Sequence, residues 1–285
     1  MTHLQGDDVV MSLPQYTTCT RVEGNAILER MTHIPKQIGH LHLYVRKDKE
    51  AILDFFARDI SRKLKEFRDT ERRDVLFLSS GGSALAVLDR IDESVIGPYL
   101  TIGIFDERYD PTNKTSNYAA LRKTRFFTRA VTHGCRLIDT RTGPGQTPED
   151  LADSYEQELR AWRALHPRGA IMATMGIALG GLTAGIVPFP ENPDAFHALF
   201  ESDRWITSYD ATGRDPFPKR ITTTFTFLRY VDMVGVFLVG EEKGEMFREL
   251  LAGEDRAAMP GRIILSLPRG AIYTDESLLH AAGMR

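Results

Sequence analysis

The stretch "VLFLSSGGSALAVLDRI", residues 75–91, changes its pattern twice within a few positions. Residues 75–78 form an apolar run that is typical of a fully buried strand. The segment "SSGGS" (79–83) follows at once and leads into "ALAVLDRI" (84–91), whose apolar residues have helical spacing. We therefore predict a strand, a glycine turn and a helix in immediate succession.

The same alternation recurs on both sides of this stretch. Upstream, the apolar residues recur every three or four positions and predict a helix over 47–67. Downstream, we predict strands at five further runs: "YLTIGIF" (99–105), "AIMATM" (170–175), "MVGVFLV" (233–239), "RIILSL" (262–267) and "AIYTD" (271–275). This order predicts an α/β fold with a mostly parallel, doubly wound sheet, helices on both faces and short C-terminal strands.

Composition limits the classes of partner. The net charge is -3, and Lys and Arg are interspersed with Asp and Glu, so we expect no nucleic-acid partner. No apolar run approaches the roughly 18 residues that span a bilayer, so we expect no membrane partner and a cytoplasmic location. The two cysteines, Cys19 and Cys135, lack the spacing of a metal site, and we expect neither a disulfide framework nor a metal.

The chain is expected to form one main domain. Residues 1–38 have no sustained periodicity and are interpreted as an N-terminal extension. Residues 39–285 carry the alternating pattern without an internal repeat or a Gly/Ser or Pro linker, so we assign them to a single α/β domain. The oligomeric state stays open.

The glycine turn has the composition of an anion site. Gly81 and Gly82 allow close approach of the backbone, while Ser80 and Ser83 add hydroxyl donors at the start of the predicted helix. A phosphate would fit such a turn. The alternative is an ordinary strand-to-helix connection in which Ser83 caps the helix, and spacing alone leaves both readings open.

A second polar cluster, "FDERYDPTNKTSNY" (105–118), begins where a predicted strand ends. Asp106 and Glu107 should therefore lie on the ligand side of the sheet. Carboxylates at this place could act as a general base, bind sugar hydroxyls or pair with Arg108. The residue types alone leave these three roles open.

The motifs "SGGS", "DER" and "SNY", followed by the glycine-rich loop "MGIALGGLTAGIVP" (175–188) and "KRITTTFTFL" (219–228), keep one order along the chain. In this combination the chain resembles the 6-phosphogluconolactonase and glucosamine-6-phosphate deaminase family, and is more similar to the lactonase branch. The resemblance covers roughly residues 47–278. It implies a role in carbohydrate metabolism, a phosphorylated sugar or sugar lactone as ligand, and no cofactor.

The resemblance also implies roles for individual residues. The phosphate-holding turn matches Ser80, Gly81, Gly82 and Ser83. Arg220 matches an arginine that helps to hold the anionic end of the substrate, as a guanidinium can do with two hydrogen bonds. Asp106 matches the acid near the sugar, and the residues that shape or support this side of the pocket are Glu107, Arg108, Ser116 and Asn117. We take Asp106 and Glu107 as the catalytic candidates.

The glycine-rich loop departs from the family pattern in the segment Gly180, Gly181, Leu182 and Thr183. Gly180 stands at the position of the family's acid, and Leu182 at that of the histidine expected as general base in lactonases. Loss of a positioned base typically lowers a rate on the order of a hundred- to ten-thousand-fold. The titratable residues that could substitute are Asp106, Glu107, Asp110 and Lys114, whereas His166 and His197 are expected to be ordinary surface residues.

Two hypotheses follow from this departure. In the first, the protein is a 6-phosphogluconolactonase-like hydrolase with an altered catalytic loop and a relocated base, for which Asp106 is the leading candidate. Alternatively, it is a non-catalytic sugar-phosphate sensor or partner subunit that has lost the family's acid and histidine. Leu182 favours the second hypothesis, while the retained acid and Arg220 favour the first.

Overall fold

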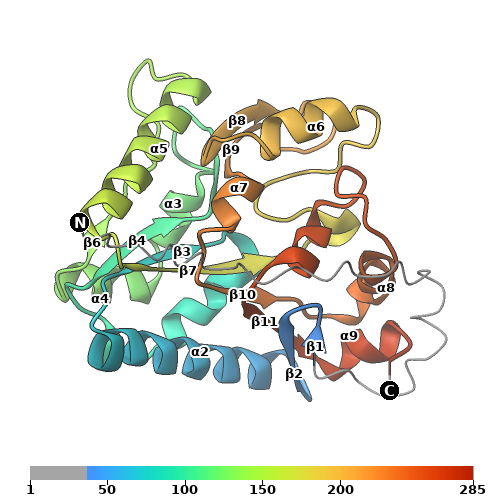
Figure 1. Cartoon of the computed structure of the whole chain (residues 1–285), viewed down its shortest axis with the longest axis horizontal. Helices are drawn as coiled ribbons and strands as arrows, with labels where there is room; N and C mark the ends of the chain where they lie inside the picture. The colour runs from blue at the N-terminus through green and yellow to red at the C-terminus, as the bar shows by residue number, and fades with distance from the viewer. Residues whose placement is uncertain (1–36, 285) are drawn as a thin grey trace, which may run out of the picture.

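An eight-stranded sheet forms the centre of the molecule in a computed structural model, which describes residues 37–284 (Figure 1). Neighbouring strands are parallel except at the β1–β2 edge, which is antiparallel. In spatial order the strands are β1 (Gln37–Ile38), β2 (Leu41–Arg46), β11 (Gly270–Asp275), β10 (Met233–Phe237), β7 (Ala170–Gly176), β3 (Val75–Ser79), β4 (Leu100–Ile104) and β6 (Arg136–Leu137).

The apolar runs form the central strands because both faces of the sheet are covered. The predictions at 75–78, 99–105, 170–175 and 233–239 are confirmed as β3, β4, β7 and β10. Every residue of β3 and β4 is buried, as expected for parallel strands between two helical layers. The run at 271–275 is confirmed as β11, which lies inside the main sheet between β10 and β2.

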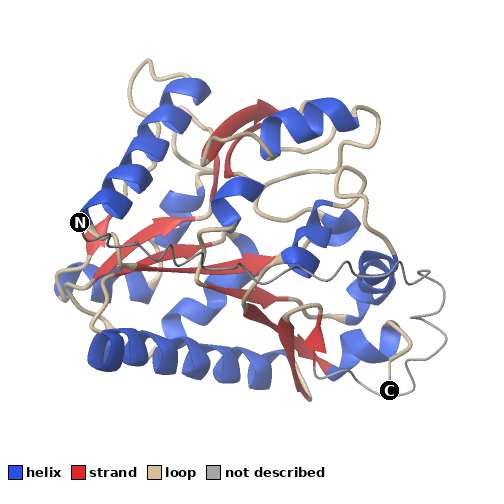
Figure 2. Ribbon diagram, in the orientation of Figure 1, coloured by secondary structure: helices blue, strands red, loops and turns tan. Residues whose placement is uncertain are grey.

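Helices cover both faces of this sheet (Figure 2). One face packs against α2 (Lys49–Lys65), the 3-10 helix Gly82–Arg90 and α4 (Arg125–Thr132). The other face packs against α5 (Pro148–Leu165), α7 (Phe225–Leu228) and α8 (Gly244–Ala252), while α6 (Pro193–Phe200) lies farther out, beside residues 206–210. Two short helices, α3 (Asn117–Leu121) and α9 (Glu276–Ala281), complete the set. The predicted helix at 47–67 is thus confirmed, and so is the predicted fold class.

A second, three-stranded antiparallel sheet was not predicted. It consists of β5 (Asp106–Arg108), β9 (Lys219–Thr223) and β8 (Ile206–Asp210), in the order β5-β9-β8. Only Phe105 separates β5 from β4, so one continuous segment supplies strands to two sheets. This small sheet places the "DER" segment directly beside the "KRITT" segment, although they are far apart in the sequence.

The predicted strand at 262–267 is wrong, because the segment belongs to a 3-10 helix, Pro260–Ser266. The β-branched composition favoured a strand, but the burial follows a helical spacing. Ile263, Ile264 and Leu267 are buried, whereas Leu265 is only partly buried and Ser266 is exposed. Burial of one helical side in the core therefore overrides the local propensity.

The N-terminal boundary is described only in part. Residues 37–38 form β1 and pair with β2, and the rest of the expected N-terminal extension lies outside the described residues, as does Cys19. Cys135 is buried with a free thiol. Within residues 37–284, no helix is both long and apolar enough to cross a membrane.

Candidate functional site

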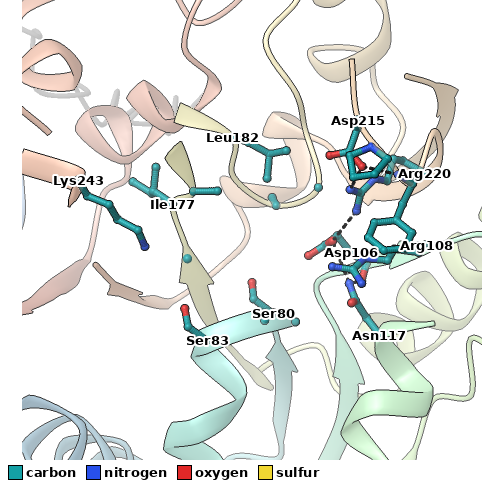
Figure 3. Close-up of a pocket in the computed structure, with 18 residues that line it drawn as sticks. Ser80, Ser83, Asp106, Arg108, Asn117, Ile177, Leu182, Asp215, Arg220 and Lys243 are labelled. Atoms are coloured by element: carbon teal, nitrogen blue, oxygen red, sulfur yellow. Dashed lines mark hydrogen bonds and ion pairs between the residues drawn. The ribbon is translucent and has the colours of Figure 1, made fainter. Parts of the chain in front are cut away.

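The carboxyl ends of four adjacent parallel strands border one cavity of about 330 Å³ (Figure 3). The chain segments that follow β3, β4, β7 and β10 all contribute to its lining. The direction in which successive strands are added reverses between β3 and β7, and open α/β sheets bind their ligands at such a point.

Most of the residues selected from the sequence meet in this cavity. Those that line it are Ser80, Gly81, Gly82, Ser83, Asp106, Arg108, Asn117, Leu182 and Arg220. Those that do not line it are Glu107, Ser116, Gly180, Gly181 and Thr183. Most of the predicted residues therefore lie together around one cavity. Glu107 and Ser116 lie behind its wall.

The glycine turn after β3 requires its glycines. A side chain at Gly81 would place Cβ 2.4 Å from Asn117 Oδ1, and Gly82 has a φ of +65°. The Ser80 amide donates to Thr174 O at 3.2 Å, which ties the turn to β7. Ser80 Oγ is buried and has no hydrogen-bond partner among the described residues. The turn thus presents an uncommitted hydroxyl and the free N–H groups of a helix start.

Asp106 is the buried carboxylate of the cavity, with 7% of its surface exposed. It accepts a hydrogen bond from Asn117 Nδ2 at 3.1 Å, and Arg220 Nη1 lies 4.0 Å from Asp106 Oδ2. Burial raises its pKa, while the charges of Arg220 and Arg108 act in the opposite direction. A Cβ on Gly185 would lie 2.8 Å from Asp106 Oδ2, so the glycine-rich loop approaches this carboxylate closely because Gly185 has no side chain.

Glu107 points away from the cavity and organises the segment behind it. Its carboxylate accepts hydrogen bonds from five groups: the amides of Arg108, Asn117 and Tyr118, and the hydroxyls of Ser116 and Thr140. Burial nevertheless raises the pKa of Glu107 to about 7. Ser116 also caps α3 by accepting from the Ala119 amide at 3.1 Å. Together, Glu107 and Ser116 hold the start of α3 and so place Asn117 against Asp106.

Two arginines form one wall of the cavity. Arg108 and Arg220 are register partners across β5 and β9. Arg220 is 4% exposed and its Nη2 donates to Asp215 Oδ1 at 2.6 Å. The Arg108 guanidinium lies over the ring of Phe217, 4.1 Å from its centroid, and no carboxylate of the described chain lies within 4.0 Å of it. The Nε atoms of both arginines are buried without a hydrogen-bond partner in the described structure.

The glycine-rich loop turns Leu182 toward the cavity and Thr183 away from it. Leu182 is half-buried and lines the cavity, while Thr183 Oγ1 donates to Gly176 O at 2.8 Å. Gly181 is packed so closely that a Cβ there would lie 2.2 Å from Met259 Cγ. The position expected to hold a histidine therefore faces the cavity, and it presents an apolar side chain.

Sequence reasoning missed Lys243 and Asp215, which both line the cavity. Lys243 follows β10 and enters from the side opposite the arginines (Figure 3). Burial lowers its pKa. Its place in the first turn of helix after a buried parallel strand could have drawn attention to it. Asp215 had no comparable signal, since it lies in the connection between β8 and β9 of the unpredicted sheet.

The other titratable candidates lie outside the cavity: Asp110, Lys114, His166 and His197. Asp110 is occupied by the amides and hydroxyls of Thr112 and Thr115, which lower its pKa. His166 and His197 pair with surface carboxylates, as expected for ordinary surface residues. No cluster of three or more potential metal ligands occurs within residues 37–284.

Comparison with known proteins places this geometry in context. The family model described as glucosamine-6-phosphate isomerases/6-phosphogluconolactonase matches residues 47–273. No curated protein gives a match by sequence. Three solved structures share the fold over nearly their whole length.

The 6-phosphogluconolactonase from Shewanella baltica OS155 is 20% identical, with a TM-score of 0.65 over 84% of this chain and 98% of that one. The enzyme from Trypanosoma brucei is 16% identical, with a TM-score of 0.67 and the same two coverages of 84% and 98%. The enzyme from Thermotoga maritima is 21% identical, with a TM-score of 0.63 over 82% and 99%. At these identities the likeness concerns the fold.

Proposed function

This chain belongs to the family of glucosamine-6-phosphate isomerases and 6-phosphogluconolactonases, and we propose that its cavity binds a phosphorylated sugar or sugar lactone. The observation that carries the proposal is the set of uncommitted donors around one cavity. Ser80 Oγ, Arg108 Nε and Arg220 Nε are buried there without partners in the described chain. Buried donors without partners are costly, and an anionic, hydroxyl-rich ligand would satisfy them.

The phosphate is assigned to the turn formed by Ser80, Gly81, Gly82 and Ser83. This turn offers backbone N–H groups and hydroxyls, and a helix start favours negative charge. Lys243 and Arg220 supply positive charge from opposite walls of the same cavity. Arg220 keeps its Nε free while Asp215 holds Nη2, so the guanidinium is oriented before a ligand binds.

Asp106 is the proposed general base for lactone hydrolysis. In this step it takes a proton from water as the water oxygen attacks the lactone carbonyl carbon. The bond to the ring oxygen then breaks, and that oxygen receives the proton, which leaves a sugar acid phosphate. Arg108, which has no carboxylate partner within the described residues, is suited to stabilise the oxyanion that forms on the way. The raised pKa of Asp106 brings it toward the range that general bases use.

A non-catalytic binding role is the second candidate, and Leu182 favours it. The side chain at this position faces the cavity but cannot take or give a proton. In this role Asp106 binds a sugar hydroxyl. Its hydrogen bond from Asn117 and the nearby Arg220 suit it to that role as well as to catalysis.

Hydrolysis of freshly generated 6-phosphogluconolactone, followed against its spontaneous background, tests the proposal. We expect the wild type to accelerate the reaction and the Asp106→Asn variant to lose about a hundredfold or more. The wild-type rate should rise with pH, because Asp106 acts only when deprotonated and its pKa is raised. If neither protein exceeds the background while 6-phosphogluconate still binds, the binding role is correct. If 6-phosphogluconate does not bind either, the proposed ligand class is wrong.

A further inference from the structure

The cavity of the candidate site continues into a second cavity of about 630 Å³. The two share Ala178, Leu182, Asp215 and Lys243, so they meet along the glycine-rich loop. The first cavity carries the buried, uncommitted donors, and none of those donors lines the second. The first cavity is therefore the polar part of the combined space, and the second cavity lacks these donors.

The apolar lining of the second cavity comes from the glycine-rich loop. Leu179, Leu182 and Val187 line it, and Leu179 is 60% exposed. This exposure does not arise from an unsupported loop. The Ala178 amide donates to Leu182 O at 2.9 Å, and the Gly181 amide donates to Ala178 O at 3.0 Å. Leu179 is thus held at the tip of a closed turn with its side chain in solvent.

The charged residues at the edge of the second cavity balance one another. They are Arg214, Asp215, Glu242 and Lys243. Arg214 lies 3.7 Å from the centroid of the Phe189 ring and 3.4 Å from Glu191 Oε1, and Asp215 is occupied by Arg220. With two charges of each sign and these pairings, the edge offers no net field for a second anionic group.

Resting on the proposed sugar-phosphate function in its non-catalytic form, since a lactone carbonyl carbon has no bond left for a further substituent, we infer that the ligand is a sugar phosphate carrying an uncharged apolar substituent at the carbon remote from the phosphate. The phosphate lies at the Ser80–Ser83 turn, and the substituent covers Leu179 and Leu182 in the second cavity. Covering exposed apolar surface is favourable, and ligand sites commonly join a few polar anchors to an apolar wall. The loop that lost the acid and the histidine thus provides an apolar subsite.

Calorimetric binding of two probes to the full-length protein tests this inference. The probes are glucose 6-phosphate and phenyl β-D-glucoside 6-phosphate, which differ by one aromatic ring. We expect the phenyl compound to bind about tenfold or more tightly than glucose 6-phosphate. Equal affinities would overturn the apolar subsite and leave the proposed function intact. If neither probe binds while 6-phosphogluconate does, this inference is wrong and the proposed function stands; if 6-phosphogluconate fails as well, the proposed function is wrong too.

A matched pair of surface variants locates the effect. Leu179→Ser should reduce the advantage of the phenyl compound several-fold and leave the affinity for glucose 6-phosphate unchanged. Leu165→Ser is the control, because Leu165 is 68% exposed but lies at the end of α5, away from both cavities. The same affinities in both variants would overturn the inference, since the preference would not depend on Leu179.

Discussion

Arg108 and Arg220 lie directly opposite each other across the antiparallel pair of β5 and β9, and both enter the same cavity. Like charges in register destabilise a sheet. Burial and the neighbouring charge of Arg220 accordingly lower the pKa of Arg108. Asp215 neutralises one guanidinium at 2.6 Å, and Phe217 supports the other by stacking. An arrangement that opposes its own stability in this way is expected where an anion binds.

The first prediction concerns the phosphate. At concentrations near a hundred times Kd, 6-phosphogluconate should raise the Tm by roughly 5 °C or more, because a ligand that binds only the folded state stabilises it. Gluconate at the same concentration should leave the Tm unchanged, since it lacks the group that the Ser80–Ser83 turn holds. Differential scanning fluorimetry measures both. Equal shifts with the two compounds would contradict the phosphate assignment.

The second prediction separates affinity from folding at Arg220. Arg220→Gln should weaken binding of 6-phosphogluconate by about tenfold to a hundredfold. It should also lower stability, because the partly buried Asp215 loses its partner. The double variant Arg220→Gln/Asp215→Asn should recover stability in urea unfolding without recovering affinity in calorimetry. Recovery of affinity in the double variant would show that Arg220 acts only as a structural partner.

The third prediction restores chemistry to the divergent loop. Gly180→Asp/Leu182→His should raise the rate of 6-phosphogluconolactone hydrolysis by about a hundredfold, because an imidazole would then face the cavity. An Asp side chain has room at position 180, since a Cβ there meets nothing within 4 Å, but the φ of +77° strains any residue other than glycine, so the variant should lose some stability.

The control for this graft is Gly180→Asp/Leu182→Asn, which has a polar side chain of moderate size but no base. It should remain at the wild-type rate. If the histidine variant also remains there while binding 6-phosphogluconate normally, an imidazole at position 182 does not reach the attacking water.

The fourth prediction concerns Glu107 and stability. Glu107→Ala should lower the free energy of unfolding by about 3 kcal/mol or more, because it removes the acceptor of five hydrogen bonds.

The same residue should make stability depend on pH. The pKa of Glu107 is raised from 4.5 to about 7, so the folded state holds its proton more tightly than the unfolded state. This group therefore makes stability fall as pH rises from about 4.5 to about 7. Urea unfolding across this range should give a shallower slope for Glu107→Gln than for wild type; identical slopes would contradict the assignment.

Much of the fold was predictable because its signals are local. Each buried strand is an apolar run in the sequence, and the glycine turn at 79–83 lies between the apolar run of a strand and the periodic pattern of a helix. Chemistry-bearing residues that directly follow such strands must meet at one edge of a parallel sheet. For this reason Ser80 and Asp106 could be placed on the ligand side of the sheet before any contact was known, whereas Arg108 was assigned through the family resemblance.

Other features depended on contacts between distant segments. Residues 262–267 have the composition of a strand, but they pack against the core as part of a 3-10 helix. Asp106 and Glu107 are adjacent in the sequence, but successive side chains of a strand point to opposite faces. Glu107 therefore points into a hydrogen-bond network, whereas Asp106 points into the cavity. Neither outcome has a local signal that distinguishes it from its alternative.

By itself, the sequence determined the parallel sheet, the glycine turn between a strand and a helix, and the absence of a titratable side chain at position 182, because each follows from residue types within a short segment. Only the tertiary structure decided that Arg108 faces Arg220, that Asp215 holds Arg220, and that Lys243 enters the same cavity from the other side. These relationships join residues from different elements, and the physical reason is that register and packing, which set them, are properties of the assembled sheets.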